Sequence, residues 1–292
     1  MHVCSVIPIQ DTVRTRDGFH IGLSVYLPPG ESGRVLVIGP GAGIEQVQYQ
    51  SFATYCSQQG CTAITFDYRG TGRSGPGIPK DYEATLRQWA NQDLDAVLLY
   101  AKKRFPNQEI VFLGHCISGE IVGLAPASEY IDQLIMVGSS LACWRLWPRS
   151  SQPRIALMKI ASPLISKCFG YFPGKRLGFL GDLPLGVMRE ISDWCERPNG
   201  VFDVFPDNNF QKLNIPILAL SFSDDWCTPP EAGSALLDHF SAAQKEWLHL
   251  RPADLGIAQI GHSGFFDQAN KQLWQFTLEW ITAPKTIKGY FF

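Results

Sequence analysis

The sequence lacks an excess of charge of either sign. Its 292 residues contain 25 Lys and Arg against 27 Asp and Glu, which gives a formal net charge of −2. This balance excludes the basic surface that phosphate backbones require, so we expect no nucleic-acid partner. Long blocks of like charge are also missing, and 45% of the residues are hydrophobic. The chain can therefore bury a large core, and disorder is excluded.

Signals for membranes and secretion are missing as well. The most apolar long stretch, residues 155–172, is interrupted by two lysines, a proline and a glycine, so we expect no membrane span. The first residues show no basic region followed by a long apolar one, and we expect no signal peptide. Eight cysteines occur without a CxxC pair. This usage predicts reduced thiols in a cytoplasmic protein.

Motifs for cofactors are also lacking. The sequence contains no Walker motif and no metal-ligand spacing, and the glycine-rich segment 39–43 does not follow the GxGxxG pattern of dinucleotide sites. We therefore expect neither a metal ion nor an organic cofactor.

Short apolar runs alternate with longer helical patterns along most of the chain. The runs are apolar at successive positions, which is typical of strands covered on both faces. They lie at 35–38, 62–66, 110–113, 134–137, 215–220 and 247–250, and helical periodicity covers 49–56, 86–101 and 269–282. Residues 1–27 resemble a hairpin with turn chemistry at 16–18. This order predicts an α/β protein with a mostly parallel sheet.

The alternation breaks between about residues 141 and 212. This segment is rich in Trp, Pro, Arg and Phe and contains helical stretches at 153–169 and 184–195. We interpret it as a cap, or lid, inserted over the carboxyl edge of the sheet, with residues 1–140 and 213–292 forming the core. The alternative is a second small domain that is unrelated to the functional site.

The strongest chemical signal is the segment GHCISG at 114–119. It follows the strand at 110–113 directly and precedes a helical stretch, which is the order of a nucleophile elbow. The sharp turn requires small residues two positions before and after its centre, and Gly114 and Ser118 occupy them. The central residue is Cys116, placed where backbone N–H groups and the helix dipole stabilise an anion. Ser118 is a poor nucleophile candidate because it lies inside the helix.

The partners of this nucleophile are expected later in the chain. Asp225 follows the strand at 215–220 and is our choice for the carboxylate, with Asp224 as the alternative. His262 lies in a glycine-flanked loop before the last helix and is the candidate base. For the oxyanion we expect two backbone N–H donors. One is Ile117, next to the nucleophile, and the other is Ala42, with Gly41 as the alternative.

Together these features resemble the α/β-hydrolase fold family over nearly the whole chain. Residues 67–74 are similar to the family's DxRGxGxS turn, to which we assign no catalytic role. The chain also resembles a bacterial group of predicted α/β-hydrolases in several short segments: 40–43, 170–178, 182–184, 186–189 and 261–266. Most members of that group carry serine in the elbow. The resemblance implies the fold, with helices on both sheet faces, and the triad positions Cys116, Asp225 and His262.

The cysteine suggests what the reaction is. A thiol loses its proton more easily than a hydroxyl, and a thioester acyl-enzyme reacts readily with amines, thiols and carbon nucleophiles. We therefore expect an acyltransferase or condensing enzyme that acts on a small acyl substrate, presented as an ester or as a CoA or carrier-protein thioester. The alternative is a thioesterase or carboxylesterase with the same triad. Cys-elbow relatives such as dienelactone hydrolases and polyhydroxyalkanoate synthases include both outcomes.

Other interpretations stay open at this point. The chain could be a binding protein that has kept the fold without the chemistry, or a lyase acting by proton transfer. Cys116 could also be an engineered replacement of serine. The sequence does not identify the acyl donor, the acceptor or the oligomeric state.

Overall fold

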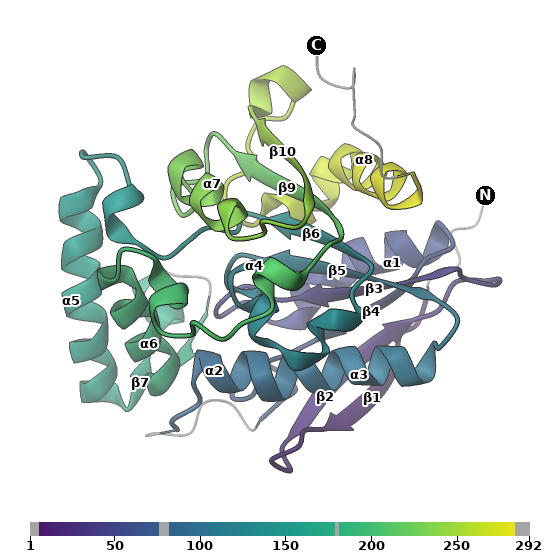
Figure 1. Ribbon diagram of the computed structural model, residues 1–292, viewed down its shortest axis with the longest axis horizontal. Coiled ribbons are helices and arrows are strands. Elements are labelled where there is room, and N and C mark those ends of the chain that lie inside the picture. Colours follow the sequence, from purple (N-terminus) through teal and green to yellow (C-terminus); the bar gives the residue numbers. More distant parts are fainter. Residues whose placement is uncertain (1–5, 76–81, 179–180, 284–292) are drawn as a thin grey trace.

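The central feature of the computed structural model, which describes residues 6–75, 82–178 and 181–283, is an eight-stranded sheet (Figure 1). Its strand order is β1-β2-β4-β3-β5-β6-β9-β10. The strands are β1 (Ile9–Arg14), β2 (His20–Tyr26), β3 (Arg34–Gly39), β4 (Thr62–Phe66), β5 (Glu109–His115), β6 (Gln133–Val137), β9 (Pro216–Phe222) and β10 (Gln244–Leu250). Strand β2 pairs antiparallel with β1 and β4, and the other pairings are parallel. The predicted mostly parallel sheet is therefore confirmed.

The predicted strands and helices correspond closely to those observed. Strands β4 and β6 are buried at every position, as their unbroken apolar runs indicate. The helices are α1 (Gln50–Gln58), α2 (Leu86–Gln88), α3 (Asp95–Arg104), α4 (Ile117–Ile121), α5 (Gln152–Phe169), α6 (Leu185–Glu196), α7 (Pro230–Asp238) and α8 (Lys271–Thr282). A π-helical stretch, Trp89–Leu94, joins α2 to α3, a detail that the helical periodicity of 86–101 did not predict.

Helices cover both faces of the sheet and enclose a core on each. Helices α1 and α8 lie on one face, where Phe52 packs against Trp274 (Figure 1). On the other face, the stretch α2–α3 buries Trp89, which stacks on Tyr68. Burial of this apolar surface is the main source of stability. The two cores hold the sheet rigidly, so the loops at its carboxyl edge start from fixed positions.

The segment 67–74, which resembles a family turn, forms a hydrogen-bonded corner. The buried Asp67 carboxylate accepts bonds from the backbone N–H groups of Gln46 and Arg73. The buried Arg69 guanidinium bonds to Asp93 and to Asp17. These contacts connect β4 to the hairpin and to the helical stretch α2–α3, which is a structural role.

The described residues of the segment 141–212, which exclude 179 and 180, contribute no strand to the central sheet. They contain helices α5 and α6 and a two-stranded sheet made of β7 (Tyr171–Phe172) and β8 (Leu183–Pro184). Figure 1 shows α5 and α6 beside each other at one side of the molecule. The division into core and cap stays a prediction.

Neither α5 nor any other helix in the described ranges combines the length and apolarity needed to cross a membrane.

Candidate active site

The predicted elbow is a sharp turn between a strand and a helix. Strand β5 ends at His115, α4 begins at Ile117, and Cys116 between them has φ 54° and ψ −118°. Among the described residues, Cys116 is the only non-glycine residue with a positive φ. Such a conformation costs on the order of 1–3 kcal/mol and persists only where the surrounding structure imposes it. Here the Cys116 N–H donates to the carbonyl of Val137 at 3.0 Å, which ties the turn to β6.

Close packing explains the small residues around the turn. A Cβ added to Gly114 would lie 2.6 Å from the backbone nitrogen of Gly119, and one added to Gly119 would lie 2.3 Å from Ser139 Oγ. Both positions therefore require glycine. The Ser118 hydroxyl is buried, donates to the carbonyl of Pro40 at 2.6 Å and lies 2.8 Å from the Tyr68 hydroxyl. It is a structural group rather than a second nucleophile.

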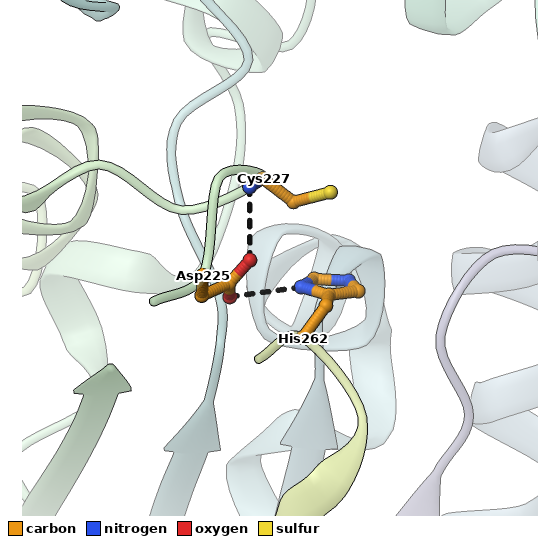
Figure 2. A group of neighbouring side chains, drawn as sticks. All are labelled: Asp225, Cys227 and His262. Atoms are coloured by element: carbon orange, nitrogen blue, oxygen red, sulfur yellow. Dashed lines mark hydrogen bonds and ion pairs between the residues drawn. The ribbon is translucent and has the colours of Figure 1, made fainter. Parts of the chain in front are cut away.

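The structure brings Asp225 and His262 together. His262 Nδ1 lies 2.9 Å from Asp225 Oδ2, and Asp225 Oδ1 accepts the backbone N–H of Cys227 at 2.8 Å. Figure 2 shows the carboxylate between these two groups. Asp224, the alternative carboxylate, instead accepts the backbone N–H of Ile260 at 2.9 Å. Because Asp225 occupies Nδ1, the ring presents Nε2 as its remaining proton-transfer atom.

Charge around the imidazole favours its protonated form. Burial opposes a charge on His262, but its electrostatic interaction with Cys116 and its hydrogen bond to Asp225 raise the His262 pKa to about 10. Burial likewise opposes the Asp225 charge, yet the contacts to His262 and the Cys227 N–H hold its pKa below the ordinary value. The arrangement can thus support a thiolate–imidazolium pair steadied by a carboxylate.

A second histidine connects three parts of the site. His115 is buried, and its Nε2 lies 2.9 Å from the carbonyl oxygen of His262. A carbonyl only accepts, so Nε2 carries the proton and Nδ1 must accept. The partner of Nδ1, at 2.8 Å, is the Tyr49 hydroxyl, which itself accepts the N–H of Gly41. Burial and the neighbouring His262 lower the His115 pKa to about 3, consistent with this neutral ring.

This network was not predicted from the sequence. Tyr49 occupies an apolar position of a helical pattern, and nothing in that pattern indicates a role for its hydroxyl. The only available signal was the chemical one, that a buried tyrosine hydroxyl usually has a hydrogen-bond partner.

The two backbone N–H groups predicted as oxyanion donors belong to residues next to the cavity at Cys116. Ala42 and Ile117 line the same cavity as Cys116. The alternative donor, Gly41, gives its N–H to Tyr49, whereas the N–H of Ala42 meets no acceptor within the described residues. The N–H of Ile117 belongs to the first residue of α4, which has no intrahelical acceptor. Both groups are therefore available to a ligand.

A cavity of about 210 Å³ opens beside Cys116. Helices α5 and α6 contribute much of its lining, and most of the side chains are apolar. The lining residues are Ala42, Cys116, Ile117, Glu120, Ser140, Ala142, Trp147, Ile155, Met158, Lys159, Ser162, Met188, Ile191, Ser192 and Cys195. Such a cavity suits a largely apolar ligand.

Three residues of the site bring possible metal-ligand atoms together, but those atoms are poorly suited to bind a metal ion. The ligand atoms of Asp225, Cys227 and His262 lie within 4.8 Å of one another. However, both Asp225 oxygens are hydrogen bonded, one of them to His262. Burial and nearby negative charge also raise the Cys227 thiol pKa, which disfavours the thiolate that metals bind. The donor set fits a hydrogen-bonded pair better than a cation.

Sequence comparison connects the chain to two groups of proteins. A family model described as serine aminopeptidase, S33, matches residues 30–173, just under half of the chain. An uncharacterised 31.7 kDa protein of Escherichia coli, from the traX-finO intergenic region, is 24% identical over 279 residues, covering 85% of this chain and 92% of that protein. The family description names a serine enzyme, whereas this chain has Cys116 at the elbow.

Solved structures resemble the chain over almost its whole length. A soluble variant of monoglyceride lipase from Saccharomyces cerevisiae is 19% identical with a TM-score of 0.67, covering 99% of this chain and 98% of that one. An esterase from Exiguobacterium antarcticum is 14% identical with a TM-score of 0.62, covering 94% and 100%. Together with the sheet order, these likenesses show that the chain has the α/β-hydrolase fold.

Proposed function

We propose that this protein is an acyl-transfer enzyme that forms a thioester acyl-enzyme on Cys116, with His262 as the proton carrier and Asp225 as its orienting carboxylate. The observation that carries the proposal is the position of Cys116. It sits on a turn with a positive φ, contributes electrostatically to the raised pKa of an imidazole that is bonded to a carboxylate, and lines an apolar cavity.

The first half of the reaction uses these groups in order. The Cys116 sulfur attacks the carbonyl carbon of a thioester or ester, and its proton passes to His262 Nε2. The oxyanion that forms accepts hydrogen bonds from the N–H groups of Ala42 and Ile117. The bond to the leaving thiol or alcohol then breaks, and the imidazolium returns the proton to it. The products are a free thiol or alcohol and an acyl group on Cys116.

The second half releases the acyl group to an acceptor. An amine, a thiol or a carbon nucleophile attacks the thioester carbonyl, gives its proton to His262, and restores the Cys116 thiol. Transfer is favoured over hydrolysis because water competes poorly for a thioester in a covered apolar cavity. We assign residues 141–212 as the cap that provides this cover. The thiol chemistry requires a reducing environment such as the cytoplasm.

Hydrolysis by the same residues is the second candidate. The structural likeness to an esterase and to a monoglyceride lipase favours it, although likeness at this level of identity concerns the fold. In that case water replaces the acceptor in the second half-reaction, and the enzyme is a thioesterase or carboxylesterase.

The test is to detect the acyl group on the enzyme. The protein is incubated with acyl-CoA thioesters, with and without an amine, and its intact mass is measured. We expect one acyl adduct, located on Cys116, that disappears faster when the amine is present. Cys116→Ala should lose the adduct and turnover, and Cys116→Ser should retain some ester hydrolysis. The control Cys168→Ala removes an exposed thiol of α5 and should keep the adduct.

The opposite results discriminate between the candidates. Free acid released at the same rate with and without the amine would favour the hydrolase. Full activity of Cys116→Ala would contradict both candidates, since both depend on this nucleophile. If Cys116 reacted with iodoacetamide no faster than the other cysteines, the result would favour a binding protein over an enzyme.

A further inference from the structure

Glu120 is a buried carboxyl in the wall of the cavity, and the proposed reaction does not use it. Its side chain is only 3% exposed, and it lines the cavity together with Cys116. It lies on α4, the helix that begins directly after Cys116. Glu120 is therefore close to the start of any acyl chain bound to Cys116.

The carboxyl has one hydrogen bond and no charged partner. Glu120 Oε1 accepts the backbone N–H of Ala142 at 2.7 Å. The ion pairs of the described residues do not include Glu120. Burial raises the Glu120 pKa to about 8, so the neutral acid predominates at pH 7. Because Oε1 accepts from an N–H, the acid proton resides on Oε2, which has no hydrogen-bond partner among the described residues.

Two of the other polar groups that line the cavity have partners elsewhere. Lys159 forms an ion pair with Glu196, and the Ser192 hydroxyl donates to the carbonyl of Met188 within α6. Glu120 Oε2 is not among the fully buried atoms that lack a hydrogen-bond partner, so it keeps access to the cavity that Glu120 lines. A ligand oxygen in the cavity can therefore accept a hydrogen bond from it.

We propose that Glu120 is a specificity-determining residue that donates a hydrogen bond to an oxygen on the acyl chain, an oxo or hydroxyl group a few carbons from the thioester. The inference rests on the proposed function, because it assumes that the acyl chain extends from Cys116 into this cavity. It narrows the substrate class to oxygen-substituted acyl thioesters, as opposed to simple fatty acyl chains.

Binding to a protein that cannot react provides the test. In the Cys116→Ala background, calorimetry compares acetoacetyl-CoA with butyryl-CoA and levulinoyl-CoA with valeryl-CoA, pairs that match in chain length and differ in one oxo group. We expect about ten-fold tighter binding of at least one oxo-acyl thioester at pH 7, the effect of one hydrogen bond. This preference should decline as the pH rises through 8, where Glu120 loses the proton that it donates.

Substitutions separate hydrogen bonding from packing. Glu120→Gln keeps an acceptor for Ala142 and a donor for the ligand, so the preference should persist and lose its pH dependence. Glu120→Met keeps the length of the side chain without a donor, so the preference should vanish. The control Glu190→Met removes another partly buried glutamate that accepts a backbone N–H but does not line the cavity, and it should leave the preference unchanged.

Each result bears on a separate claim. Equal binding of the matched thioesters to the Cys116→Ala protein, or a preference that survives Glu120→Met, would overturn the role of Glu120. Neither result affects acylation of Cys116, which is measured separately by intact mass. Conversely, an oxo preference lost in Glu120→Met supports the role of Glu120 even if wild-type Cys116 forms no adduct, in which case the proposed function alone is wrong.

Discussion

The two walls of the cavity differ in how firmly their groups are held. On the sheet-edge side, Cys116 follows β5 directly, and hydrogen bonds join His262 to Asp225 and to His115 at the end of β5. The wall formed by α5 and α6 packs through apolar side chains, and α5 leaves Leu157 and Ile160 67% and 60% exposed. Proton transfer and nucleophilic attack are sensitive to displacements of the reacting atoms of about 1 Å. An apolar wall needs only the right shape.

The sharpest test of this contrast removes the imidazole. We expect His262→Ala to lower turnover by at least about a thousand-fold, because the nucleophile then has no proton acceptor at its side. Thermal unfolding should show that the variant is folded. Turnover within ten-fold of the wild type would mean that the sheet-edge wall is not the catalytic one.

Removing a supporting hydroxyl should have a smaller effect. Tyr49→Phe leaves His115 Nδ1 and the Gly41 N–H without their partner, which costs about 1–3 kcal/mol of stability. We expect kcat to fall roughly ten-fold with little change in KM, because the loop that carries Ala42 loses its anchor. Steady-state kinetics and urea unfolding measure the two effects. The control Tyr55→Phe alters a hydroxyl of α1, the helix that begins after Tyr49, away from this network, and should change neither kcat nor stability.

The charge on Cys116 can be examined through His262. Since the electrostatic interaction with Cys116 contributes to the raised His262 pKa, Cys116→Ala should lower that pKa, as followed by NMR titration of the ring. Protonation of His262 stabilises the folded state fully below its ordinary pKa of 6.5, and this stabilisation is lost as the pH rises toward 10. In the variant the loss should occur at lower pH. An unchanged pKa would argue against a thiolate beside the ring.

The smallest effect is expected on the outer surface of α5. Ile160→Gln replaces an exposed apolar residue with a polar one of similar size, and we expect a change in unfolding free energy below about 0.5 kcal/mol. Activity should also be unchanged. A loss of unfolding free energy well above this value would show that the Ile160 side chain makes stabilising contacts. The outer surface of α5 would then contribute to stability as the sheet edge does.

Several parts of the site could be predicted because their signals are local. A strand followed by small residues and a helix indicates the elbow at Cys116, and a carboxylate just after a strand indicates Asp225. Those patterns follow from backbone geometry and from the requirement for glycine at close contacts. The helix periodicity of 49–56 and 86–101 was informative for the same reason, since apolar faces must be buried.

Other parts could not be predicted because their partners are distant in the chain. Tyr49 and His115 are 66 residues apart, and Glu120 and Ala142 are 22 apart. In the sequence, Tyr49 is one position of an apolar stripe and Glu120 is one charge on a short helix. Their environment exists only after β5, the elbow and the segment from 141 onward have come together.

The amino-acid sequence alone determined the order of strands and helices, the strained turn and the residue types placed around it, since these depend on neighbours a few positions away. Tertiary structure alone decided which N–H groups are left available and that a glutamic acid is buried in the cavity wall. The physical reason is that hydrogen-bond pairing and loss of water depend on positions in space, and the folded sheet brings those positions together.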